Sequence, residues 1–135
     1  MSDESTASKD EQGMTAEYNF EDVYANNSSF ETSAWDLKLI FGQLDQTSRS
    51  KRVVNWHTAV TIPWAQAKIM AYYLAINVVF HEIQHGPIKV PSTVLPPFPR
   101  EPLEEEGKAA KDLVEMMRFY HEHIFGEQSS VRDPA

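Results

Sequence analysis

The chain has 135 residues and a mass of 15.4 kDa, with 41% hydrophobic residues, 24% charged residues and no cysteine. This length supports one modest hydrophobic core. The lack of cysteine excludes disulfides, thiol catalysis and zinc sites built on thiolates. Twelve basic against twenty acidic residues give a net charge of −8, which disfavours nucleic acid or an anionic membrane as the main partner. The first residues show no signal-peptide pattern, so we predict a cytoplasmic protein.

The acidic charge is concentrated at the two ends of the chain. Residues 1–17 hold five acidic residues and one basic (−4), residues 18–90 hold six of each, and residues 91–135 hold nine and five (−4). The first segment is also poor in apolar residues, which is typical of disorder. We predict a disordered acidic tail over 1–17, an α+β domain over 18–90, a proline-rich linker over 91–102, an amphipathic helix over 103–126 and a second tail over 127–135.

Alternating apolar residues predict two strands, over 34–41 and 52–62, and residues 23–31 form a weaker strand candidate. The polar segment from Gln43 to Lys51 is interpreted as the hairpin loop between the first two. His57 lies on the less apolar face of its strand and is interpreted as a strand histidine. These segments predict a small antiparallel sheet of about three strands.

The period then becomes helical. Pro63 suits a first helical turn, and Gly86-Pro87 ends the helix after His85. Residues 69–80 are apolar except for Asn77, yet this run is shorter than the roughly 20 residues of a membrane span. A helix that is apolar all round must be covered all round, and one small sheet covers one face. We expect a second copy or the C-terminal helix to cover the rest, and we favour a homo-oligomer. The expected interface residues are Ile69, Tyr72, Tyr73, Ile76, Val79 and Phe80.

Six of the eight prolines lie between Pro87 and Pro102, which predicts an extended, semi-rigid segment. After it, apolar residues recur at three- and four-residue spacing from Leu113 to Ile124, opposite charged residues. This pattern predicts an amphipathic helix that ends at Gly126 and whose apolar stripe docks on the long helix or on a partner protein.

One motif carries chemistry, the H-E-x-x-H formed by residues 81–85. On a helix, His81 and His85 share one face and can bind zinc, while Glu82 can act as general base for a zinc-bound water. The motif occupies the last helical turn, however, and a third ligand would have to come from another segment, such as His121. Histidines at a helix C-terminus also interact favourably with the helix dipole. We therefore assign no catalytic, cofactor or metal residue, and keep zinc at His81 and His85 with Glu82 as the alternative.

Residues 24–90 resemble the prokaryotic domain-of-unknown-function 3467 family. The resemblance is carried by Tyr24-Ala25-Asn26, by residues 35–42 (WDLKLIFG), by the helix start at Pro63 and by the ending Glu82…Gly86-Pro87-Ile88. It implies a bacterial protein with this fold and no assigned activity. Members of the family end this helix with aromatic residues where this chain has His81 and His85, which makes the motif a departure within a non-catalytic helix end.

Together these features predict an α+β protein: a small antiparallel sheet packed on one long helix, then a proline-rich linker and a C-terminal amphipathic helix. We expect a non-enzymatic, homo-oligomeric binding or adaptor protein that engages a protein partner, without nucleic acid, membrane span or cofactor. The alternatives are a minimal zinc-dependent hydrolase and a chaperone-like binder.

Overall fold

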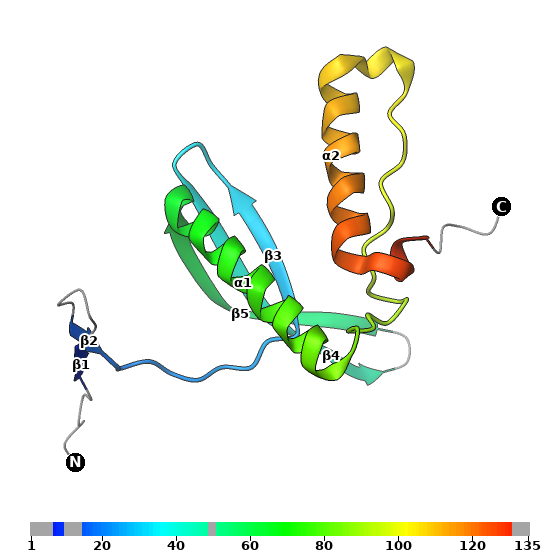
Figure 1. Ribbon diagram of the computed structural model, residues 1–135. Helices are drawn as coiled ribbons and strands as arrows, with labels where there is room; N and C mark the ends of the chain where they lie inside the picture. The colour runs from blue at the N-terminus through cyan, green and yellow to red at the C-terminus, as the bar shows by residue number, and fades with distance from the viewer. Residues whose placement is uncertain (1–6, 10–14, 49–50, 131–135) are drawn as a thin grey trace. The chain divides into compact units, whose positions relative to one another are not determined.

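The computed structural model describes residues 7–9, 15–48 and 51–130 and contains two small sheets and two long helices (Figure 1). The chain divides into two compact units, residues 1–76 and residues 77–135, and helix α1 continues from the first into the second. Strands β1 (Ala7–Lys9) and β2 (Thr15–Glu17) pair with each other inside the segment expected to be an acidic tail. The architecture is α+β, as the sequence predicted.

The main sheet is antiparallel with the order β3-β4-β5, where β3 is Asn27–Thr32, β4 is Asp36–Ser48 and β5 is Lys51–Pro63. The pairs Leu39↔Val60 and Leu37↔Ile62 place apolar side chains on neighbouring strands. Of the hydrophobic side chains that the structure describes, only Leu39 and Ile62 are buried, each 9% exposed. The core that one chain builds is therefore very small.

Strands β4 and β5 extend beyond the predicted strands, so the prediction of a loop from Gln43 to Lys51 is wrong. The ladder continues through Gln43↔Asn55 and Asp45↔Val53 as far as Ser48↔Lys51, and residues 49–50 lie outside the described part. The polar composition of residues 43–48 concealed the strand, because ladder hydrogen bonds use the backbone and do not require apolar side chains. The result is a long two-stranded ribbon.

The ribbon bends at an irregularity beside Gly42. The pairs Phe41↔Thr58 and Gly42↔Trp56 leave His57 as an extra residue in β5, which is the pattern of a β-bulge. A Cβ added at Gly42 would lie 2.7 Å from the carbonyl oxygen of Asn55, so only glycine fits. Asn26 spans the site: its N–H donates to the Gly42 carbonyl oxygen (3.1 Å), and its Oδ1 accepts the N–H of Leu44 (2.7 Å).

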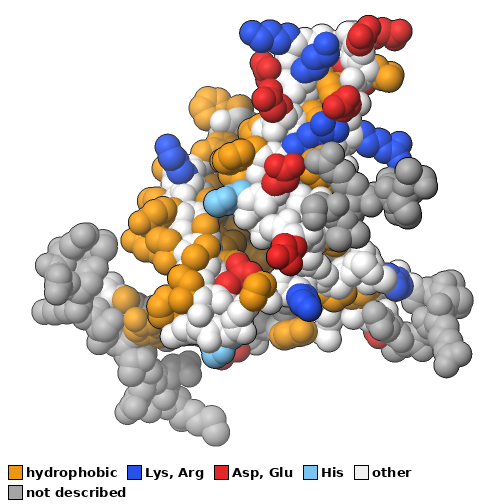
Figure 2. Space-filling model, turned by 45° about the vertical axis from the view of Figure 1, so that its right-hand side comes forward, with side chains coloured by type: hydrophobic (Ala, Val, Ile, Leu, Met, Phe, Trp, Pro, Cys, Tyr) orange, Lys and Arg blue, Asp and Glu red, His pale blue; other side chains and the backbone are white. Residues whose placement is uncertain are grey.

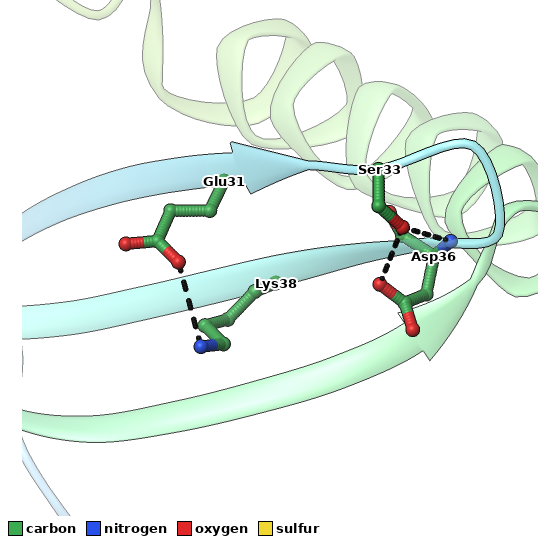
Figure 3. Close-up of polar contacts among 4 residues, drawn as sticks. All are labelled: Glu31, Ser33, Asp36 and Lys38. Carbon is green, nitrogen blue, oxygen red and sulfur yellow. Dashed lines mark hydrogen bonds and ion pairs between the residues drawn. The ribbon is translucent and has the colours of Figure 1, made fainter.

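The turn from β3 to β4 is organised by Ser33 (Figure 3). Its Oγ accepts the N–H groups of Trp35 (3.1 Å) and Asp36 (3.0 Å) and lies 2.9 Å from Asp36 Oδ1. A cross-strand ion pair joins Glu31 to Lys38 at 3.4 Å. The indole Nε1 of Trp64 donates to the Ser33 carbonyl oxygen (3.0 Å), so the first residue of the long helix is tied to this turn.

Helix α1 runs from Trp64 to His85, as the proline before it and the glycine after it predicted. Gly86 has φ = 88°, a conformation that favours glycine, and its N–H donates to the Glu82 carbonyl oxygen (2.8 Å). The C-terminal part of the chain contains η1 (Glu104–Glu106), α2 (Gly107–Phe125) and η2 (Gly126–Ser130). The one-turn helix η1 and α2 together match the predicted helix over 103–126, and η2 starts the segment expected to be a tail.

Candidate functional site: helix α1 and the proline-rich strap

Helix α1 is apolar around most of its circumference, and it has no buried residue. A globular helix of this composition normally buries its apolar side chains against neighbouring elements. Hydrophobic side chains accordingly reach the surface of the face drawn in Figure 2. Exposed apolar surface on this scale marks an interaction site in a native protein.

The six residues expected to form an interface all lie on this exposed surface. Their exposed fractions range from 45% for Ile76 to 63% for Tyr72, and Ile83, one turn further on, is 76% exposed. The rings of Tyr72 and Tyr73 contact each other edge to face, with centroids 5.3 Å apart. Because no described residue buries these side chains, the interface stays a prediction.

The H-E-x-x-H residues have the geometry that their spacing predicts. The rings of His81 and His85 lie side by side with centroids 4.7 Å apart, and both side chains are exposed. Glu82 acts within the helix ending, because its Oε2 accepts the N–H of Ile88 at 2.9 Å. The described residues hold no group of three or more histidine, aspartate or glutamate side chains arranged to bind a metal ion. Within one chain the motif therefore provides two imidazoles and a carboxylate that holds the backbone.

His121, considered above as a third zinc ligand, has a different place. It is 7% exposed, and its Nε2 lies 2.8 Å from the Pro96 carbonyl oxygen while its Nδ1 lies 2.6 Å from Ser129 Oγ. The carbonyl can only accept, so Nε2 carries a proton. In the neutral imidazole, Nδ1 then accepts the Ser129 hydroxyl. Both nitrogens are used to hold the chain together.

These bonds belong to a longer contact between α2 with η2 and the proline-rich strap, the name used here for residues 87–102. The strap runs alongside α2 in Figure 1. Gln128 accepts the N–H of Val90 (3.0 Å) and donates to its carbonyl oxygen (2.7 Å). Arg118 donates to the Pro99 carbonyl oxygen (2.8 Å), and its guanidinium lies 5.1 Å from the Phe98 ring centroid. Contacts from α2 and η2 thus hold the strap at Val90, Pro96 and Pro99.

A cavity of about 580 Å³ lies between the strap and α2, lined by residues that include Phe98, Arg118, His121 and Ser129. This arrangement was not predicted from the sequence. The signals available were a histidine, a glutamine and an arginine at otherwise polar positions of an amphipathic helix and its continuation. A proline-rich segment offers many carbonyl oxygens without a backbone partner, and these side chains bind them. The spacing of the three residues does not indicate this.

A comparison with protein families gives a match. Residues 1–90 match the family described as "Protein of unknown function (DUF3467)". No curated protein and no solved structure matches the chain. Among the described residues, no helix is long and apolar enough to cross a membrane. Two of the segments that carry the family resemblance, Tyr24-Ala25-Asn26 and the end of WDLKLIFG, meet at the bulge beside Gly42.

Proposed function

The chain belongs to the DUF3467 family, and from that premise we propose that it is a non-enzymatic, homo-oligomeric adaptor that binds a protein partner. The observation that carries this proposal is the absence of any buried residue in α1, which is the most apolar segment of the chain. Burial of one large apolar side chain contributes roughly 1.5–3 kcal/mol. Several such side chains on one helix make self-association the arrangement that best removes them from water.

The part of the protein that would engage a partner is α2. Leu113, Met116, Tyr120 and Ile124 follow one another at helical spacing and are each about half exposed. The strap and η2 fasten α2 in one conformation, so its stripe is presented without further ordering. An amphipathic helix of this kind binds in a hydrophobic groove of another protein.

A zinc-dependent hydrolase is the second candidate, supported by the adjacent rings of His81 and His85. It would need two further changes: release of Glu82 from the Ile88 N–H and a third ligand from another molecule. Metal analysis of untagged protein beside the His81→Ala variant separates the two candidates. Stoichiometric zinc that the variant loses would support the hydrolase, and zinc-free protein that stays folded in chelator would rule it out.

The adaptor proposal is tested by the mass of the full chain in solution. We expect light scattering at micromolar concentration to give at least twice the 15.4 kDa of one chain. A monomer that remains soluble, folded and free of bound dye for apolar surfaces would contradict the proposal. A dissociating oligomer that suppresses aggregation of an unfolded client would instead favour a chaperone-like binder.

A further inference from the structure

Part of the apolar residues of α1 follow a seven-residue repeat. Isoleucine recurs at 69, 76 and 83, and a second series at 65, 72 and 79 consists of Ala65, Tyr72 and Val79. The spacings of three and four are those of the a and d positions of a coiled coil, which form one straight seam on a helix. Each large member of the seam is at least 45% exposed. His81 and His85 fall on the opposite side of the helix.

We infer that α1 pairs with α1 of a second copy as an antiparallel two-helix coiled coil, an inference that rests on the proposed homo-oligomer. In antiparallel pairs each a residue faces a d residue of the other helix. The alignment that uses the whole seam places Ile69 against Val79 and Tyr72 against Ile76, and it places Ala65 against Ile83. Every layer then combines a larger side chain with a smaller one, which favours even packing.

Charge supports the same alignment. Lys68 and Glu82 flank the seam on one side and are the only charged side chains of α1. In the antiparallel pair, Lys68 of each copy comes beside Glu82 of the other, giving two symmetric ion pairs. The second carboxylate oxygen of Glu82 is available, since only Oε2 accepts the Ile88 N–H. Ala75 lies opposite Ala75 at the two-fold axis, where its small side chain allows close approach.

A parallel pair fits less well. It would stack Ala65 on Ala65 and Tyr72 on Tyr72, which alternates a void with crowding, and it would bring Lys68 beside Tyr73 and leave no opposite charges adjacent. Antiparallel helices also set opposite ends of their dipoles side by side. A two-fold pair uses the same patch on both copies, so the interface closes and no further copies are added through α1.

The chain contains no cysteine, so single cysteines report the alignment directly. The full-length variants Ala65→Cys and Ile83→Cys are mixed, equilibrated and oxidised. Because the two sites face each other in the antiparallel pair, we expect a disulfide-linked heterodimer from the mixture. Ile83→Cys alone should give little crosslink, because its two copies lie about 27 Å apart along the axis.

The crosslinking results distinguish the antiparallel pairing from the oligomeric proposal. Efficient crosslinking of Ile83→Cys alone would establish a parallel pair and overturn the inference. Absence of crosslinks in a protein that light scattering shows to be a dimer would place the interface elsewhere, overturning the inference while the oligomeric proposal stands. A monomer would overturn both. Circular dichroism of the reduced variants, compared with the unchanged chain, confirms that the helices are formed.

A charge reversal tests the alignment without cysteine. Lys68→Glu places a second carboxylate beside each Glu82 and should raise the dimer dissociation constant about tenfold at low salt. Lys89→Glu changes the net charge equally outside α1 and should leave the constant unchanged. Equal effects of the two variants would contradict the antiparallel alignment.

Discussion

The strap-bound helix α2 and the long helix α1 differ in how their side chains find partners. Around α2, a single chain supplies its own partners: His121, Gln128 and Arg118 each hold backbone atoms of the strap. Around α1, contacts from Trp64 and Glu82 hold the two ends, and within the described part of the chain none of the helix residues is buried. Polar side chains thus hold α2 within the single chain, while our proposal assigns the cover of the apolar side chains of α1 to a second molecule.

This contrast separates two kinds of stability. The hydrogen bonds to the strap form within one chain, and losing a partner would leave a buried polar group unpaired, which costs free energy of folding. Apolar area is non-directional and is removed from water by any matching surface. The strap unit should therefore be insensitive to protein concentration, whereas the stability of α1 should depend on it.

The largest expected effect comes from a charge in the seam. Ile76→Asp would place two carboxylates near the two-fold axis, and we expect the dimer dissociation constant to rise by at least about 100-fold. Sedimentation at several concentrations measures it. Leu74→Asp is the matched control, because Leu74 is 66% exposed and lies on the opposite side of α1. If Leu74→Asp dissociates the dimer and Ile76→Asp does not, the seam is misplaced.

A smaller effect is expected at the strap. His121→Ala leaves the Pro96 carbonyl and the Ser129 hydroxyl without their partner and should destabilise the strap by about 2 kcal/mol. Limited trypsin digestion measures this as faster cleavage after Arg100. His123→Ala is the control, since His123 is exposed and stacks on Phe119. Dimer mass should stay unchanged, and dissociation of the His121 variant would show that the two regions are not independent.

The smallest effect is expected for Gln128→Ala, which removes both hydrogen bonds to Val90. We expect a loss of about 1 kcal/mol, seen as roughly fivefold faster cleavage after Lys89. Gln84→Ala, on the exposed surface of α1, should not change the cleavage rate. Equal rates in the Gln128 variant and the unchanged chain would mean that the amide contacts do not hold the strap.

Periodicity was sufficient to predict the elements that hydrophobic spacing defines. The alternation around Leu39 and Val60 gave the strands, and Pro63 with Gly86 gave both ends of α1. The polar ends of β4 and β5 escaped prediction because a ladder needs only backbone groups. The bulge at His57 escaped because it depends on the close packing of Gly42 against the neighbouring strand.

Only part of the candidate site could be predicted from the sequence. The exposed residues of α1 followed from a run too apolar for one small sheet to cover, and the spacing of His81 and His85 brought their rings together. The strap contacts could not be predicted, because they join single side chains to backbone atoms up to 38 residues away. Such pairs leave no periodic pattern in a sequence.

The central claim is that a second molecule covers α1, and hydrogen exchange of its backbone amides tests this most directly. We expect amides between Ile69 and Ile83 to be protected and their protection to increase with protein concentration, while amides of α2 show no such dependence. Protection of α1 that is the same at all concentrations, in a protein that sediments as a monomer, would contradict the account.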